Sequence, residues 1–460
     1  MNLKKLTQNT ILNIFTPPMK KSLFIFRQDL RVYDNRWLIK AIEESDEILP
    51  IFILDKNIIS DFWWIQDKKF WFLREVLEKL SEDIEKLSQQ KLRIFYDFPE
   101  KIVPVLVEKY SIDTVYVNKS YSRYGAKKRD LSLREILYSV GKEFIQVSDY
   151  LLVEPEDIEQ RKVFTPYFKL WQKKHKDTQE LSPKPFKAIT TEENFEPKDF
   201  ISLPSHPFFT FEFGQKRFTS FLHENYNDLR NDLDRDGTSK LSVYIRFWVF
   251  SIRQIYNKSA HIESFVSELA WREFWQHIDY YFPECKEIEF QATKRNISWE
   301  TDENNIYFQK FIAGETGYPI VDACIKQLLT TNRMHGRWRM ITASFLTKDL
   351  HIDWRLGEKF FKKHLLDYDE NINFWNWQWS ASVWADPKPI RIFNPILQSQ
   401  KFDKETVFIK KYIKGLEKYE SFEIHDPITH HLSDYFPIIV DHNREQKIAK
   451  EMYKQSKEIL

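Results

Sequence analysis

Cysteine is nearly absent from this chain of 460 residues, which contains only Cys285 and Cys324. Two thiols are too few for a four-thiolate zinc or iron–sulfur centre, and such scarcity is typical of a protein from a reducing, cytoplasmic setting. We expect both cysteines to be small buried core residues, and we predict no metal site.

The sequence also lacks long hydrophobic runs and an excess of one charge. No apolar stretch approaches the roughly 18 residues that a membrane-spanning helix needs. Residues 1–19 lack the apolar segment and cleavage site of a signal peptide, and Met19 is a second candidate for the start of the chain. Lys and Arg number 69 against 68 Asp and Glu, which excludes a uniformly basic surface for nucleic acid but not a local basic cleft. We therefore expect a globular protein with no membrane contact.

The first third of the chain alternates strand and helix patterns. Residues 70–90 have the apolar spacing of an amphipathic helix. Five short apolar runs are typical of buried parallel strands: 22–27, 48–55, 92–98, 114–121 and 144–153. This order predicts an α/β domain with a doubly wound parallel sheet over 20–153, preceded by an extension over 1–19. The dinucleotide motif G-x-G-x-x-G and the Walker motif are both absent.

The remaining chain has a different pattern. Prolines recur through 154–207, which we interpret as a connection between domains with one short helix near 167–174. From 208 to 460, apolar residues recur at i, i+3 and i+4 without strand-like alternation. This part is predicted to form a larger all-α domain.

Two groups of residues in the all-α part suit ligand binding. Thr238, Ser239 and Ser242 follow Gly237, where hydroxyl and N–H groups at a helix start favour an anion such as a phosphate; a plain helix cap is the alternative. The segment 268–275 places a carboxylate and two indoles on one helix face, which suits a planar base, although a buried aromatic stripe has the same spacing.

Two further groups carry indoles and opposite charges. Tryptophans gather at Trp354 and through 371–382, where close rings can pass an electron by hopping or simply pack together. The segment 334–340 carries two arginines and 365–370 two aspartates, which would be costly to bury without a partner or a polar ligand. A solvated charged face is the alternative.

Together, these groups and four longer strings resemble the photolyase/cryptochrome flavoprotein family. The strings are FIFRQDLRVYDN (24–35), TGYPIVDACIKQL (316–328), MITASFLTKDL (340–350) and RIFNPILQSQKFD (391–403). They occur in this order and span nearly the whole chain. The sequence is most similar to class I-type photolyases that act on cyclobutane pyrimidine dimers.

The resemblance implies FAD in the all-α domain, with reduced FADH⁻ as the active form. It implies these cofactor contacts: Tyr226, Thr238, Ser239, Lys240, Leu241, Ser242, Glu268, Arg272, Arg339, Asp367, Tyr368, Asp369 and Asn373. Asn373 would face flavin N5, where an amide adds no negative charge and so favours the reduced anion. A second, antenna chromophore stays open as a deazaflavin, a flavin or none, because 118–130 lacks the Glu that a folate antenna usually employs.

The resemblance also implies a partner, UV-damaged DNA. Trp271 and Trp379 would sandwich the flipped lesion, and the expected catalytic residues are Glu268, Trp271, Met340, Asn373 and Trp379. The residues expected to contact DNA or the rim of the lesion are Trp271, Gly336, Arg337 and Arg391. Trp377, Trp354 and Trp299 match the family's electron-hopping chain, which reduces the flavin but does not perform repair.

The predicted function is therefore light-driven repair of cyclobutane pyrimidine dimers by electron transfer from excited FADH⁻, in a protein that we expect to be a monomer. The alternative is a cryptochrome-like blue-light photoreceptor that binds FAD without repair. A third reading is a flavoprotein whose cleft is blocked by Trp375 and Trp384.

Three tryptophans, Trp248, Trp375 and Trp384, stand where the family pattern has glycine. Glycine accounts for only 9 of 460 residues, about 2% against a usual ~7%, while tryptophan numbers 15. Glycine usually marks positive φ or close backbone approach, so its replacement by tryptophan three times is physically implausible. We hypothesise that the source reads UGA as glycine; TGG codons at these positions, or an intact mass of the native protein that matches tryptophan, would reject this.

Overall fold

The computed structural model describes residues 19–58, 68–121, 128–191, 200, 202–221, 226–231, 237–386 and 388–456. The predicted extension therefore lies outside the described residues except for Met19, as does 122–127 of the segment considered for an antenna. Described residues within 1–64, 76–149 and 180–203 form one compact unit, and those within 65–75, 150–179 and 204–460 form a second. The proline-rich segment 154–207 is thus divided between the two units.

The first unit is built on a five-stranded parallel sheet in the order β3-β2-β1-β4-β5. The strands are β1 (Lys21–Phe26), β2 (Glu47–Asp55), β3 (Arg93–Asp97), β4 (Thr114–Asn118) and β5 (Glu143–Val147). Leu23 of β1 pairs with Leu49 of β2 on one side and with Val115 of β4 on the other. Five of the six residues of β1 are buried, as expected for a strand covered on both faces.

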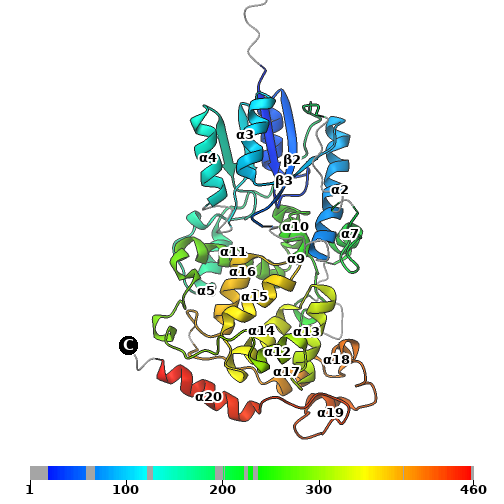
Figure 1. Cartoon of the computed structure of the whole chain (residues 1–460), viewed down its shortest axis with the longest axis vertical. Coiled ribbons are helices and arrows are strands. Elements are labelled where there is room, and N and C mark those ends of the chain that lie inside the picture. Colours follow the sequence, from blue (N-terminus) through cyan, green and yellow to red (C-terminus); the bar gives the residue numbers. More distant parts are fainter. Residues whose placement is uncertain are drawn as a thin grey trace, which may run out of the picture. The chain divides into compact units, whose positions relative to one another are not determined.

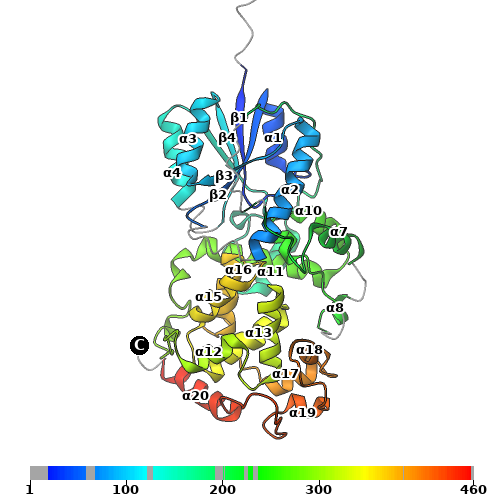
Figure 2. The same ribbon diagram turned by 45° about the vertical axis from the view of Figure 1, so that its right-hand side comes forward.

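Helices cover both faces of this sheet, which confirms the predicted doubly wound fold. They are α1 (Arg36–Glu44), α2 (Lys68–Ser88), α3 (Pro99–Lys109) and α4 (Asp130–Ser139), and the boundary between the units falls within α2. Figure 2 shows α3 and α4 together on one side of the sheet and α1 on the other.

The last predicted strand is shorter than its apolar run. Strand β5 ends at Val147, so its extension to residue 153 is wrong. The backbone N–H groups of Leu152 and Val153 donate to the side chain of Glu273 instead of to a neighbouring strand. Strand β4 also ends early, at Asn118, which forms its last register pair with Val147 of β5. The N–H of Lys119 still donates to the Val147 carbonyl at 2.9 Å.

The second unit is helical, which confirms the predicted all-α part. Its helices after the start of α2 are α5 (Phe164–Lys173), α7 (Phe211–Ser220), α8 (Tyr226–Leu229), α9 (Ser242–Arg246), α10 (Ile252–Ser259), α11 (Glu263–Tyr281), α12 (Ile306–Ala313), α13 (Pro319–Thr331), α14 (Gly336–Ser344), α15 (Trp354–His364), α16 (Glu370–Ser380), α17 (Pro395–Phe402), α18 (Val407–Tyr412), α19 (Ser421–His425) and α20 (His442–Gln455). Helix α16 packs against both α11 and α15 (Figure 1). A π-helical turn over Phe345–Asp349 continues α14.

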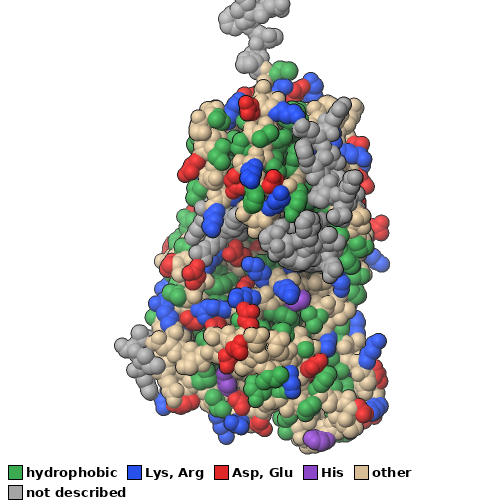
Figure 3. Space-filling view, in the orientation of Figure 1, with side chains coloured by type: hydrophobic (Ala, Val, Ile, Leu, Met, Phe, Trp, Pro, Cys, Tyr) green, Lys and Arg blue, Asp and Glu red, His purple; other side chains and the backbone are tan. Residues whose placement is uncertain are grey.

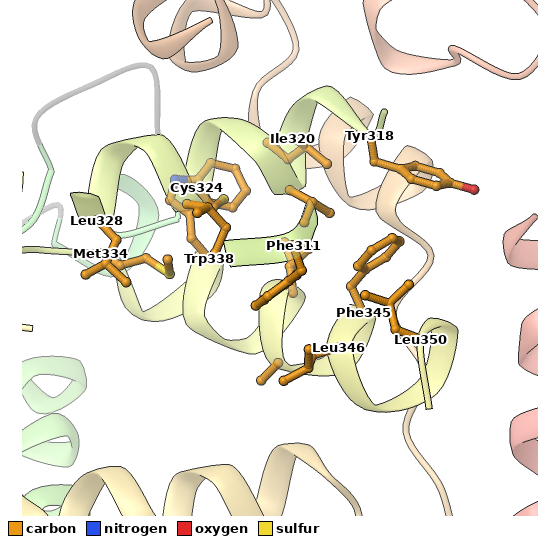
Figure 4. Packing of buried hydrophobic residues seen from close by; sticks show 14 of the residues in the cluster. Phe311, Tyr318, Ile320, Cys324, Leu328, Met334, Trp338, Phe345, Leu346 and Leu350 are labelled. Carbon is orange, nitrogen blue, oxygen red and sulfur yellow. The ribbon is translucent and has the colours of Figure 1, made fainter. Parts of the chain in front are cut away.

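A large apolar core of this unit joins α12, α13, α14 and the π-helical turn. Figure 4 shows Cys324 of α13 beside Trp338 of α14, and the rings of Tyr318 and Phe345 have centroids 5.1 Å apart. Cys324 is fully buried and Cys285 is 6% exposed, so both cysteines are core residues as predicted.

Surface charge is mixed on the face shown in Figure 3, where Lys and Arg side chains alternate with Asp and Glu. This agrees with the net charge of +1. Within the described ranges, none of the helices is both long and apolar enough to span a bilayer.

One of the three unexpected tryptophans has a backbone conformation that suits glycine. Trp248 has a φ of +47°, a left-handed value that is a genuine outlier for a bulky side chain. Trp375 and Trp384 are buried, with ring centroids 5.2 Å apart. The geometry at position 248 is the one that the glycine hypothesis requires.

Candidate functional site

A cavity of about 590 Å³ opens within the second unit, between α11, α14, α16 and the segment 237–242. Most of the predicted site residues line it: Tyr226, Thr238, Ser239, Lys240, Ser242, Glu268, Trp271, Arg272, Gly336, Arg337, Arg339, Met340, Asp367, Tyr368, Asp369, Asn373, Trp377 and Trp379. Four others do not: Leu241, Trp299, Trp354 and Arg391. The cavity has the size and mixed polarity of a cofactor site.

The hydroxyl-bearing segment 238–242 forms one wall of this cavity. Arg217 donates to the backbone carbonyls of Thr238 and Ser239, and Arg333 donates to the Thr238 hydroxyl at 3.2 Å. Leu241 is 3% exposed and packs into the core, so only its neighbours face the cavity. With Arg333 also lining the cavity, this wall has the positive charge and hydroxyl groups that suit an anionic ligand.

An ion pair with a buried carboxylate and a partly exposed guanidinium stands beside that wall. Arg339 Nη2 lies 2.8 and 2.9 Å from the two carboxylate oxygens of Asp367, whose side chain is 6% exposed. Burial raises the pKa of Asp367, but the charge and hydrogen bonds of Arg339, aided by the Ser242 hydroxyl, bring that pKa below its usual value. Asp367 is therefore an anion fixed at the cavity wall.

A tyrosine that sequence reasoning missed joins two of the predicted residues. The Tyr150 hydroxyl donates to Asp369 at 2.6 Å, and the Arg272 guanidinium lies 3.7 Å from the centre of the Tyr150 ring. Asp369 also caps α16 by accepting from the backbone N–H of Ile372. No sequence signal identified Tyr150, because it lies in the run that was predicted to continue β5.

Asn373 has a defined orientation because Glu358 binds its amide nitrogen. Its Nδ2 donates to the Glu358 carboxylate at 3.0 Å and to the Glu358 carbonyl at 3.3 Å. The Tyr368 hydroxyl donates to the same carboxylate at 3.2 Å. Since Nδ2 is engaged, Oδ1 is the atom left to accept a hydrogen bond from an N–H group of a ligand. Glu358 was not predicted, although it lies one turn after Trp354 on α15.

Two indoles of the cavity lining, Trp271 and Trp379, pack against one apolar cluster, and we call them the aromatic side of the cavity. Met340 also lines the cavity. Glu268 lies beside them in an ion pair with Arg230, with 2.6 Å between Nη1 and Oε1. Arg230 was missed because residue 230 belongs to a segment without a distinctive pattern. The ion pair holds the Glu268 carboxylate at the cavity edge.

Of the other predicted DNA contacts, Gly336 and Arg337 line the cavity and Arg391 does not. Gly336 lines the cavity, and a Cβ at this position would meet open space. Arg337 donates to Asn231 at 2.9 Å. Arg391 does not line the cavity, because its side chain pairs with Asp386 at 2.6 Å and lies over the ring of Trp379.

The three predicted hopping tryptophans share one apolar cluster. Trp377 lines the cavity, Trp354 is fully buried, and Trp299 is half-buried at the edge of the cluster. A Cβ on Gly357 would lie 2.2 Å from the Trp377 ring, so glycine is required there. The cluster thus extends from the cavity toward a partly exposed indole.

A buried carboxylate ties the segment after β5 to α11. Glu273 accepts from the backbone N–H of Leu152 at 2.6 Å and from the Trp171 indole at 2.7 Å. Burial raises the pKa of Glu273 to about 7, although these N–H donors oppose the shift. Because the pKa in the unfolded chain is lower, the folded protein binds the extra proton between about pH 4.5 and 7, and stability falls as pH rises through this window.

We expect Glu273 to lower the free energy of unfolding by roughly 3 kcal/mol between pH 4.5 and 8. Glutamine does not ionise, so Glu273→Gln lacks this pH dependence. The unfolding free energy of the wild type minus that of the variant should therefore fall by this amount across the range. Urea unfolding of both proteins at a series of pH values measures it. Other buried carboxyls such as Asp322 cancel in the difference, and parallel pH curves would contradict the assignment.

Comparisons with known proteins agree with this geometry. Residues 22–188 match the family model described as DNA photolyase, and 265–455 match the FAD binding domain of DNA photolyase. The chain is 34% identical to a deoxyribodipyrimidine photo-lyase of Synechococcus over 95% of this chain and 96% of the relative. It is 32% identical to the enzyme of that name from Vibrio cholerae, over 94% and 99% of the two chains.

Solved structures give the same result. An archaeal photolyase from Sulfolobus tokodaii with two FAD molecules has a TM-score of 0.85 and 31% identity, covering 95% of this chain and all of that one. A bacterial class III photolyase from Agrobacterium tumefaciens has a TM-score of 0.87 and 30% identity, covering 97% and 99%. The resemblance seen in the sequence is confirmed: the chain belongs to the DNA photolyase family, and its helical unit is an FAD-binding domain.

Proposed function

We propose that the protein repairs cyclobutane pyrimidine dimers in DNA with light, using FADH⁻ held in the cavity. The observation that carries the proposal is the orientation of Asn373. Its free acceptor, Oδ1, suits a protonated flavin N5 and adds no charge that would oppose the reduced anion. Bound there, FADH⁻ would on excitation supply one electron to the dimer, two C–C bonds would break, and the electron would return.

The residues around the cavity have the chemistry that binding of FAD would require. The segment 238–242 with Arg333 would hold the diphosphate, since hydroxyl groups and a guanidinium converge there. Arg339 and Asp367 would present one donor and one acceptor to the polar edge of the ring system. Asp369 is fixed by Tyr150 and would do the same beside them.

The aromatic side of the cavity would receive the lesion. Trp271 and Trp379 supply faces for stacking, and Glu268 would hydrogen-bond the pyrimidine edge. Unstacking costs a few kcal/mol and least for damaged pairs, so selectivity begins with extrusion of the dimer. Arg337, Gly336 and Arg391 would face the DNA around the opening, with the two arginines placed near phosphates.

The experiment is illumination of the chemically reduced holoprotein with an oligonucleotide that contains one dimer. We expect loss of dimers under blue or near-UV light and none in darkness. If dimers were lost with oxidised or flavin-free protein but not with the reduced holoprotein, the mechanism would be excluded. Retention of flavin and its photoreduction without any loss of dimers would identify a photoreceptor instead.

A second chromophore is a further part of the proposal. The archaeal relative holds two FAD molecules. We expect a light-harvesting pigment in this protein to appear as a second absorption band, or as flavin in excess of one per chain, after purification.

A further inference from the structure

The face of the Trp271 indole is partly occupied by the protein itself. Phe164, the first residue of α5, stacks on Trp271 with ring centroids 3.7 Å apart and planes 7° apart. Phe168 stacks on Phe164 in turn, at 5.4 Å and 12°. An aromatic column therefore runs from α5 onto α11 and ends at the indole.

This column leaves Trp271 only one face for a ligand. Phe274 meets the indole edge-on at 5.5 Å and 88°, and Trp275 lies against it at 5.6 Å and 35°. Because one face is covered by Phe164, only the opposite face can stack on a base in the cavity that Trp271 lines. A base stacked on that face would lie nearly parallel to the Phe164 ring, whose plane is 7° from that of the indole.

Helix α5 is also held in place by residues other than Phe164, whose ring meets Phe274 edge-on at 5.7 Å. Trp171 donates its indole N–H to Glu273 at 2.7 Å, and Tyr167 packs against Phe274 at 5.1 Å. Both Trp171 and Tyr167 are almost fully buried, whereas Phe164 is half-buried at the start of the helix. A change at Phe164 therefore alters the support of Trp271 more than it alters the docking of α5.

We propose that Phe164 is a positioning residue that fixes the plane of the Trp271 indole for stacking on the extruded pyrimidine. The inference rests on the proposed function, because it requires Trp271 to contact the lesion. Phe164 itself touches neither cofactor nor substrate in this scheme. Its contribution is to remove the rotational freedom that an unsupported surface indole would lose on binding.

The test measures the affinity for a dimer-containing oligonucleotide in the dark, relative to the undamaged one. Phe164→Leu keeps apolar volume but removes the planar support, and we expect a loss of about three- to tenfold, the size of one aromatic stack. Phe164→Tyr keeps the ring and should restore affinity. Phe168→Leu is the matched control: it removes the next ring of the column and should leave affinity close to wild type. Unchanged flavin absorbance verifies that each variant folds.

A double-mutant cycle with Trp271→Ala distinguishes failure of the positioning role of Phe164 from failure of the proposed function. We expect Phe164→Leu to have no further effect once the indole is gone. An equal loss in both backgrounds, or wild-type affinity in Phe164→Leu while Trp271→Ala binds weakly, would overturn the positioning role and leave the proposed function intact. Full affinity in Trp271→Ala would overturn both, because the lesion would then not stack there.

Discussion

Trp377→Phe is expected to abolish most of the photoreduction of oxidised flavin while sparing repair by protein that has been reduced chemically. Trp377 is the one predicted hopping residue that lines the cavity, so its loss would separate the cofactor from Trp354 and Trp299. Among the described residues, its indole nitrogen has no hydrogen-bond partner, so phenylalanine leaves no polar group unsatisfied. Steady illumination with an external reductant, followed by flavin absorbance, measures the effect.

Trp338→Phe is a matched control for this experiment. Trp338 is a buried indole in the same apolar cluster, but it packs on Phe408 and is not part of the predicted chain. Wild-type photoreduction is expected in this variant. Normal photoreduction in Trp377→Phe would refute the hopping assignment, whereas loss of repair in the chemically reduced variant would show that Trp377 acts in the repair step itself.

Arg339→Ala is expected to destabilise the protein by about 3–5 kcal/mol and to abolish flavin retention, because it leaves the Asp367 carboxylate buried without its counter-ion. Urea unfolding of the flavin-free protein and the flavin-to-protein absorbance ratio measure the two effects separately. Adding Asp367→Asn should recover most of the stability without restoring flavin. An unchanged unfolding midpoint in Arg339→Ala would mean that the pair contributes nothing to the folded state.

The sequence was sufficient for the elements and for most of the cavity lining. Apolar periodicity located the sheet and helices, because β1, β2 and β4 are almost entirely buried and the amphipathic helices have a buried side. Apolar periodicity failed at the end of β5. The apolar run after Val147 has the pattern of a strand, but its N–H groups donate to the Glu273 carboxylate. Hydrophobicity cannot distinguish these two environments.

The partners of the site residues were beyond sequence reasoning for a different reason. Tyr150 lies 219 positions before Asp369, and Glu358 lies 15 positions before Asn373. Such pairs depend on tertiary packing and leave no local pattern. Arg391 was expected at the DNA, but it is paired with Asp386, which its own segment supplies. Contact of Arg391 with DNA stays a prediction, and the motif could not show its neighbour Asp386.

Three consecutive residues of α11 face three different environments: Trp271 the aromatic side of the cavity, Arg272 the Tyr150 ring, and Glu273 the buried N–H groups of the segment after β5. One residue advances a helix by about 100°. A single insertion or deletion within α11 would therefore exchange indole, guanidinium and carboxylate among these environments at once. The helix should not tolerate a change of length, so the spacing of these side chains is as strict a signature of this protein as their identity.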